Sequence, residues 1–234
     1  MNSLMDTVLS AMPDLMGKEL LMNIMSAPWG NPQFKSIDNF GVAFATHTGS
    51  RRSRNEDRVV VAKITSRSQE QFAVAMVCDG VGGSEMGDMA ASLAVALFLS
   101  ELSQINRRQP LSTTLSELIR KMDDGVRLAL GGRGTTTASI LITSSTGKFA
   151  ATNVGDSRIF SWKSGDRLQQ ISVDDTIENE LQNLSVLDPS VLEARGLRGS
   201  LSQAIGEVGR SARDLRVHLF EKDQFLGGGS DYSI

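Results

Sequence analysis

Acidic side chains in this sequence stand next to glycines, at the ends of segments that read as strands. The clearest case is Asp79, which follows the apolar run Val74–Cys78 and precedes a loop with four glycines within eight residues. An acid at the end of a buried strand can face a ligand on a fixed backbone, and glycines let the main chain approach that ligand closely. Because hard divalent cations prefer carboxylate oxygens and water, Asp79 is a candidate ligand of an ion site.

Other acids occupy comparable positions but have plainer explanations when taken alone. Glu56 and Asp57 lie among four arginines just before the strand-like run Val59–Val61, and they could be a solvated acid pair. Asp156 lies in a tight turn, where aspartate is common for reasons of local hydrogen bonding. Arg158 is expected to pair with a nearby acid and hold that turn. Asp79 is the exception, because an acid at the end of a buried strand and before a glycine loop favours a functional role even when it is considered alone.

Five blocks of sequence, in order, resemble the metal-dependent serine/threonine protein phosphatases of type 2C (the PPM class) in their compact bacterial form. They lie between residue 41 and about residue 231 and therefore cover most of the chain. A single Asp-Gly pair would be weak evidence, whereas five ordered blocks are strong. The blocks are Arg52 with Asn55-Glu56-Asp57, Asp79–Gly87, Gly134–Thr136, Val154–Arg158 and Leu201–Gly206.

The resemblance implies a centre that binds two divalent ions, Mg²⁺ or Mn²⁺, with a third and weaker ion in bacterial relatives. In that interpretation Asp79 bridges the two ions, and the carbonyl oxygen of Gly80 binds one of them. Asp231 ligates the second ion, and Asp156 joins Asp231 in the third site. Carboxylates suit these roles because they hold hard cations and leave coordination positions open for water.

The resemblance also implies how a phosphate is attacked. Glu56 contacts the metals through water, while Asp57 is a metal ligand that orients or deprotonates the attacking water. Arg52 binds the substrate phosphate, for which a guanidinium fork is the best geometric match. Two ions about 4 Å apart lower the pKa of a bridging water and neutralise phosphoryl charge. Phosphoserine and phosphothreonine in proteins are then hydrolysed directly, without a covalent enzyme intermediate.

Two departures from the family pattern leave a second function open. Val81 stands where some relatives carry a histidine, so water must protonate the leaving group. Ser230-Asp231-Tyr232 replaces the usual Ser-Asp-Gly, and the sequence ends at Ile234, before the last metal-binding aspartate of the family. Loss of one carboxylate weakens metal binding by orders of magnitude. The alternative is a truncated or catalytically weak phosphatase-like module that binds phosphoproteins or partners.

The elements that must position these residues predict an α+β fold, because strands come in blocks and helices in pairs. The resemblance sharpens this prediction to a central antiparallel β-sandwich flanked by pairs of helices. The short polar turns between residues 135 and 171 indicate an antiparallel meander. Strands are expected at residues 40–46, 59–61, 71–78, 135–143, 148–153, 158–163, 167–171, 214–220 and 224–226, and helices at 87–104 and 112–130.

The sequence predicts two parts, an N-terminal methionine-rich helical extension with its linker (residues 1–36) and a phosphatase-like catalytic domain (residues 37–234). Residues 1–25 carry apolar side chains near helical spacing. They could pack on the catalytic domain or dock a partner. A membrane-surface role needs more Lys and Arg on the polar face than this segment has.

Composition limits the remaining classes of function. A net charge of −3 gives no basic surface for nucleic acid. The single cysteine, Cys78, is expected in the core and fits a reducing compartment, which predicts a cytoplasmic protein. No apolar run reaches the roughly 18 residues of a transmembrane segment. His47 and His218 are expected to be structural. The expected partners are phosphorylated proteins, the substrates of a bacterial serine/threonine kinase in a signalling pathway.

Overall fold

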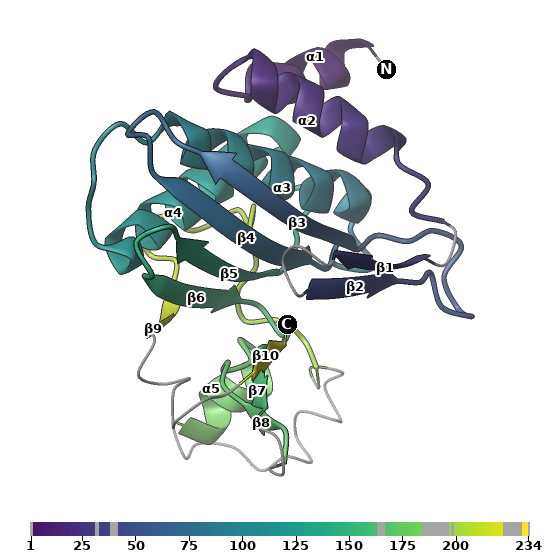
Figure 1. Cartoon of the computed structure of the whole chain (residues 1–234). Coiled ribbons are helices and arrows are strands. Elements are labelled where there is room, and N and C mark those ends of the chain that lie inside the picture. Colours follow the sequence, from purple (N-terminus) through teal and green to yellow (C-terminus); the bar gives the residue numbers. More distant parts are fainter. Residues whose placement is uncertain are drawn as a thin grey trace.

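The computed structural model describes residues 2–30, 33–37, 42–162, 167–183, 197, 199–221 and 231–233. Within these ranges, helices pack with antiparallel sheets, and the long helices lie on one side of the main sheet (Figure 1). The predicted α+β class is therefore confirmed. The described residues contain one helix pair packed on the main sheet. On the other side of the main sheet, the described residues include the short helix α5 (Ile177–Asn183) and no second helix pair.

The main sheet has five antiparallel strands in the order β3-β4-β5-β6-β9. The sequence of β4 suits a strand with one face in the core, because its alternate side chains Phe72, Val74, Met76 and Cys78 are buried. Cys78 is fully buried, as expected. The strands are β3 (Arg58–Thr65), β4 (Gln71–Cys78), β5 (Ala138–Ser144), β6 (Phe149–Val154) and β9 (His218–Glu221).

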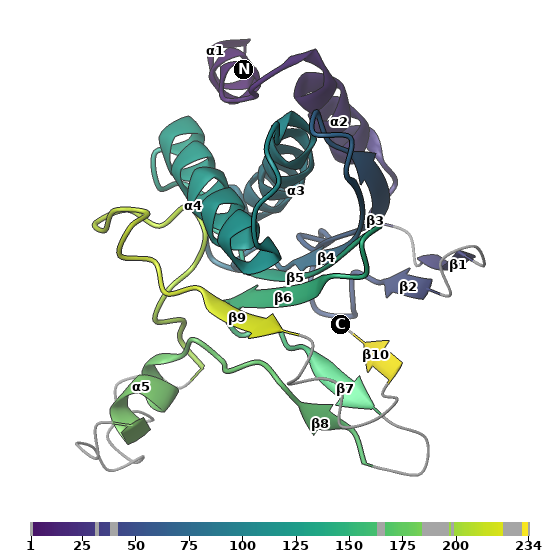
Figure 2. The ribbon, with the colours of Figure 1, turned by 60° about the vertical axis from the view of Figure 1, so that its left-hand side comes forward.

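Helices α3 (Gly87–Gln104) and α4 (Leu111–Leu130) cover one face of the main sheet (Figure 2). Helix α3 is buried over most of its length, which explains why it is rich in Ala and Leu on every side. Helix α4 has one apolar face and ends at Gly131, whose φ of 58° is the left-handed conformation that closes many helices. The two helices therefore form the second wall of the hydrophobic core.

On the opposite side of the main sheet lies a smaller sheet with the strand order β10-β7-β8, next to the hairpin β1-β2 (Figure 2). The strands expected between residues 135 and 171 therefore do not form one meander. They pair as β5-β6 and β7-β8, and the chain changes sheets at Gly155. The strands are β1 (Gln33–Ile37), β2 (Val42–Thr46), β7 (Phe160–Trp162), β8 (Gln169–Gln170) and β10 (Asp231–Ser233).

Gly155 is the physical reason for this change of sheet. Its φ of +98° is unfavourable for any residue with a Cβ, and a Cβ there would lie 2.7 Å from Thr137 Cγ2. Its amide donates a 2.9 Å hydrogen bond to the carboxylate of Asp175. The strand is thereby turned out of the main sheet, which a prediction from short polar turns does not anticipate.

The N-terminal residues form two helices, α1 (Asn2–Ser10) and α2 (Leu15–Ser26), and not one. The break contains Pro13, which cannot donate in a helix, and Asp14, whose carboxylate accepts from Gly17 N at 2.8 Å and caps α2. Ser100 of α3 donates to the same carboxylate at 2.8 Å. These contacts, with buried Val8, Met12 and Leu21 in the main core, favour packing on the domain.

The boundary predicted at residue 36 stays a prediction, although β1 places strand structure within the expected linker. Partner docking through residues 1–25 stays a prediction. The surface available for it is the outer side of α2, where Leu15, Met16 and Met22 are exposed. None of the helices in the described ranges is both long and apolar enough to cross a membrane.

Replacing Leu21 with alanine should lower the free energy of unfolding by about 2–5 kcal/mol, because Leu21 is fully buried between α2 and the core. Met22→Ala is the matched control, since that neighbouring side chain is 48% exposed. Urea denaturation followed by circular dichroism measures both. Equal stability of the two variants would contradict the packing of α2 on the domain.

Candidate metal centre and active site

Asp79 lies directly after β4, where its backbone is held on both sides. Its amide donates to Thr137 Oγ1 at 3.0 Å. Its carbonyl accepts from Thr137 N and from Thr136 Oγ1, each at 2.9 Å. Thr136, the last residue of the Gly134–Thr136 block, and its neighbour Thr137 thus clamp the end of β4. The Asp79 carboxylate is therefore presented from a fixed backbone, as its place after a buried strand predicted.

Glycines bring a second acidic segment against Asp79. A Cβ on Gly80 would lie 2.5 Å from the backbone of Gly87 and 2.8 Å from the carbonyl oxygen of Glu56. Gly80 N also donates to that Glu56 oxygen at 3.3 Å. Only glycine fits between these two chain segments. The close approach places the Glu56-Asp57 pair beside the end of β4.

Asp57 and Asp79 lie in the wall of the same cavity, close enough for each carboxyl group to feel the charge of the other. Burial raises the pKa of Asp79 from 3.8 to about 7, and the neighbouring Asp57 adds to this rise. Asp156 raises the pKa further, while Arg52 opposes the shift. Two acids pressed together in this way are stabilised when a cation lies between their oxygens. This donor set fits a hard divalent ion such as Mg²⁺ or Mn²⁺.

Arg52 lies at the junction of two cavities. Its Nη1 is 2.9 Å from Glu56 Oε2, and a Cβ on Gly82 would lie 2.3 Å from the same nitrogen. One cavity of about 190 Å³ contains Arg52 with Glu56, Asp57 and Asp79 in its wall. A second cavity of about 550 Å³ is lined by Arg52, Asp79 and Asp156 among others. The guanidinium can therefore reach an anion that lies against the acidic pair.

Asp156 lines the cavity of about 550 Å³, whereas Glu56 lines the cavity of about 190 Å³. Burial raises its pKa, with Asp174 adding to the rise and a backbone hydrogen bond opposing it. Arg158 is paired with Asp174 at 2.6 Å, as predicted from the turn. A further cavity of about 730 Å³ adjoins this region, and Asp156 and Gly199 belong to the walls of both. The candidate active site is thus an extended cleft with acids along its length.

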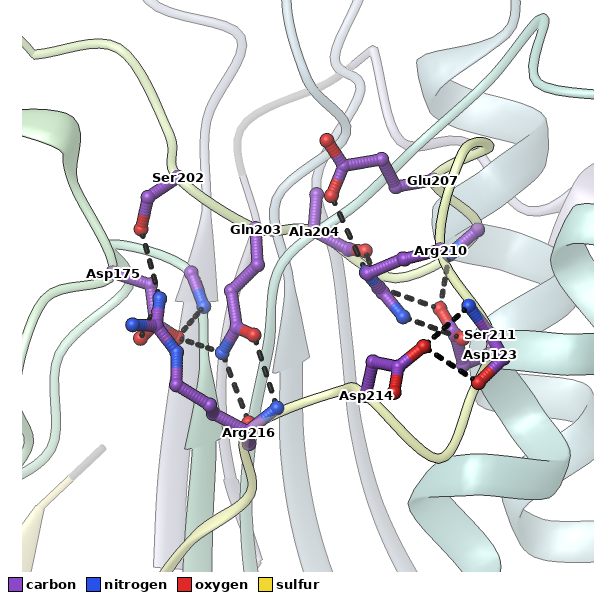
Figure 3. Close-up of polar contacts among 12 residues, drawn as sticks. Asp123, Asp175, Ser202, Gln203, Ala204, Glu207, Arg210, Ser211, Asp214 and Arg216 are labelled. Atoms are coloured by element: carbon purple, nitrogen blue, oxygen red, sulfur yellow. Dashed lines mark hydrogen bonds and ion pairs between the residues drawn. The ribbon is translucent and has the colours of Figure 1, made fainter.

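Two buried aspartates that the sequence analysis did not single out support the wall of this cleft (Figure 3). Asp175 is 3% exposed and accepts from Gly155 N at 2.9 Å and from Gln203 Nε2 at 2.7 Å. Its other oxygen is 3.0 Å from His218 Nε2, which fits the structural role expected for that histidine. Asp175 therefore joins the turn before Asp156 to the segment that follows Gly199.

Asp123 anchors the same wall to helix α4 (Figure 3). It is fully buried and accepts from Gly206 N at 2.8 Å and from the two terminal nitrogens of Arg210 at 2.9 and 3.0 Å. The available signal was an acid on a helix face that otherwise carries Ile119, Met122 and Val126. A charge at such a position requires a buried partner.

Taken together, the predicted residues Arg52, Glu56, Asp57, Asp79 and Gly80 meet at one end of β4, and Asp156 lies in the same cleft. For Asp231, the structure describes the backbone pairing with Trp162 of β7, and its side chain lies outside the described part. Within the described ranges, no three or more His, Cys, Asp or Glu side chains form a group that could hold a metal ion. The individual metal-ligand roles therefore stay predictions.

Comparisons with known proteins show which family and fold this chain resembles. A family model described as "Protein phosphatase 2C" matches residues 46–203. A putative protein phosphatase 2C-type of Streptococcus pyogenes is 27% identical over 198 residues, which are 81% of this chain and 77% of that protein. The structure of the serine/threonine phosphatase Stp1 from Staphylococcus aureus has a TM-score of 0.57 at 22% identity, over 82% of this chain and 72% of that one. The PstP catalytic domain in complex with two manganese ions has a TM-score of 0.53 at 20% identity, over 82% and 71% of the two chains.

Proposed function

Because the chain belongs to the protein phosphatase 2C family, we propose that it removes phosphate from phosphoserine and phosphothreonine in proteins by metal-dependent hydrolysis. The observation that carries this proposal within the molecule is that Asp57 and Asp79 lie in the wall of one cavity at the end of β4. A pair of this kind gains most from a divalent cation. It lies beside a cationic side chain, Arg52, and opens into a cleft large enough for part of a polypeptide.

Asp57 and Asp79 would hold the metal ions with the carbonyl oxygen of Gly80, and Glu56 would contact them through water. When bound, the ions supply a water of lowered pKa and neutralise charge on the phosphoryl oxygens. Asp57 would also orient the attacking water and accept its proton. Asp156, with Asp231, would hold a third and weaker ion. We propose Mn²⁺ or Mg²⁺ on the chemistry of these oxygen donors.

Arg52 binds the phosphate of the substrate. Its guanidinium is 60% exposed and is held in place by Glu56, so an incoming phosphate can share it without a large rearrangement. Two parallel N–H donors match two phosphate oxygens. Val81, the residue after the Asp-Gly pair, carries no proton donor, so the leaving hydroxyl of the substrate takes its proton from water.

The substrates that fit this chemistry are proteins phosphorylated by a serine/threonine kinase. The acids that line the cleft beyond Asp79, namely Asp156, Asp174 and Glu178, give the peptide-binding region a negative character. We place this activity in the cytoplasm, because the one cysteine of the chain is buried in β4 and suits a reducing compartment.

Purified protein should hydrolyse a phosphothreonine peptide when Mn²⁺ is added and should lose this activity when the metal is chelated. Phosphate release measures turnover, and the matching phosphotyrosine peptide is the control for substrate class. Turnover that survives chelation would contradict the metal-dependent mechanism. Retention of phosphopeptide binding without any turnover in Mn²⁺ or Mg²⁺ would instead support the phosphopeptide-binding module.

A further inference from the structure

The segment that follows helix α2 is fastened to that helix by Trp29. The indole nitrogen of Trp29 donates to the carbonyl oxygen of Ile24 at 2.6 Å, and its amide donates to Ala27 O at 2.9 Å. Ile24 and Ala27 belong to the last turn and the C-cap of α2. Since α2 is anchored on α3 through Asp14 and Ser100, the orientation of the Trp29 ring is set by the N-terminal helices.

The backbone of Trp29 reaches the loop that carries Asp57. Its carbonyl oxygen accepts from Asn55 Nδ2 at 3.0 Å. The same nitrogen also contacts Thr46 Oγ1 at 2.7 Å, so the Asn55 side chain is fixed between two elements. The other end of this side chain, Oδ1, accepts from the amide of Asp57 at 3.0 Å. One buried asparagine thus joins Trp29 to the amide of Asp57, the residue proposed to accept the proton of the attacking water.

The ring of Trp29 reaches the same loop by a second route. The guanidinium carbon of Arg58 lies 5.1 Å from the centre of the Trp29 ring, within the range of a cation–π contact. Arg58 Nη1 donates to the carbonyl oxygens of Asn55 and Asp57, at 3.0 and 2.8 Å. Its Nε donates to Ser92 Oγ of α3 at 2.9 Å. Arg58 is only 6% exposed, so these contacts are sheltered from water.

We propose that Trp29 is a positioning residue for the metal centre, through which the N-terminal helices hold Asp57 against Asp79. Both backbone groups of Asp57 are gripped by residues that contact Trp29, its amide by Asn55 and its carbonyl by Arg58. Trp29 and helix α2 lie outside residues 46–203, so the family match does not include the N-terminal part of this support. The inference rests on the proposed function for its effect on turnover, but its effect on metal affinity stands without it.

The expected size of the effect follows from the geometry of such sites. Groups that hold a metal ligand in place alter metal affinity or activity by about 10- to 100-fold when they are removed. Loss of the aromatic face frees Arg58 to turn away and lets the Asp57 loop move relative to β4. The substrate-binding Arg52 makes no contact with Trp29 among those described here, so the KM for the peptide should change little.

The test compares Trp29→Leu with Trp29→Phe. Leucine keeps apolar bulk without a π face, whereas phenylalanine keeps the face and loses only the N–H bond to Ile24. Met22→Ala on the exposed side of α2 is the control for a change in the same segment. Titration calorimetry with Mn²⁺ measures metal affinity, phosphopeptide hydrolysis separates kcat from KM, and circular dichroism melting confirms that each variant is folded.

Trp29→Leu should weaken Mn²⁺ binding and lower kcat, each by about tenfold, with KM unchanged, while Trp29→Phe and Met22→Ala stay within about threefold of the wild type. If leucine and phenylalanine behave alike, or if leucine lowers only the melting temperature, Trp29 merely stabilises the fold and the inference is wrong. If the wild type binds Mn²⁺ but hydrolyses no phosphopeptide, the proposed function fails and the affinities alone decide the role of Trp29.

Discussion

Asp79→Asn should abolish metal-dependent turnover, lowering kcat by more than about 100-fold. The estimate follows because even groups that only support a metal ligand cost 10- to 100-fold when removed, and Asp79 is expected to bind the metals directly. Asparagine keeps the size of the side chain but removes the charge that pairs with a divalent ion. Its backbone contacts with Thr136 and Thr137 do not involve the carboxylate and should persist. Phosphate release from a phosphothreonine peptide with saturating Mn²⁺ measures the loss.

The same variant has a second expected effect that does not depend on activity. The folded state raises the pKa of Asp79 from 3.8 to about 7, so this group binds its proton more tightly when folded than when unfolded. Stability of the metal-free protein should therefore fall as the pH rises from about 4 through about 7, where the carboxylate becomes charged. At pH 8, Asp79→Asn should melt higher than the metal-free wild type, because burial no longer opposes a charge.

Mn²⁺ should reverse this order at pH 8, since it stabilises the wild type and leaves the asparagine variant unchanged. Asp124→Asn on the exposed part of α4 is the control for loss of one negative charge. A stabilisation by Mn²⁺ that is equal in wild type and Asp79→Asn would remove Asp79 from the metal centre. In that case Asp57 and Asp79 would form a structural acid pair.

Asp123→Ala should lower the free energy of unfolding by about 3–5 kcal/mol, because the largely buried guanidinium of Arg210 loses its buried carboxylate partner and keeps only the more exposed Glu207, at 3.4 Å, as an ion-pair partner. It also leaves the amide of Gly206 without the acceptor that it has in the fold. The neighbouring Asp124→Ala is the matched control. That residue is paired with Arg127 at the surface, and its loss should cost less than about 1 kcal/mol.

A double variant separates the loss of a buried pair from the loss of a single group. Asp123→Ala with Arg210→Met should be less destabilised than the sum of the two single variants, because no unpaired charge remains. Denaturant unfolding at neutral pH measures the free energy of unfolding of the wild type, the two single variants and the double variant. If Asp123→Ala is as stable as Asp124→Ala, the wall beyond Gly199 is held by other contacts.

Local patterns were sufficient for the elements nearest the metal centre. Strand β4 and helix α3 have the predicted bounds. An apolar run that ends at a glycine loop marks β4, and an Ala- and Leu-rich run that begins after the same loop marks α3. The meeting of Asp57 with Asp79 was expected only from the family resemblance. No periodicity places two loops side by side when separate strands carry them.

What the sequence did not predict depends on partners that are distant along the chain. Gly155 leaves the main sheet because Asp175 holds its amide, 20 residues away. Asp123 is buried because Arg210 lies 87 residues further on. Trp29 falls within the N-terminal extension and linker predicted for residues 1–36, and nothing near it in sequence reveals Asn55 or Arg58 as its neighbours. Pro13 was visible, but the helical spacing of the residues around it hid the break.

The path of the chain between β6 and β9 bears on how the cleft can vary. Strand β9 returns to lie directly beside β6, so everything between Gly155 and Val217 is inserted between two neighbouring strands. Such a cassette can be lengthened, shortened or exchanged without altering the strand order of the sheet that carries Asp79. Because this segment supplies Asp156, Asp174 and Gly199 to the walls of the cleft, changes in it should reshape the cleft while the backbone that presents Asp79 stays as it is.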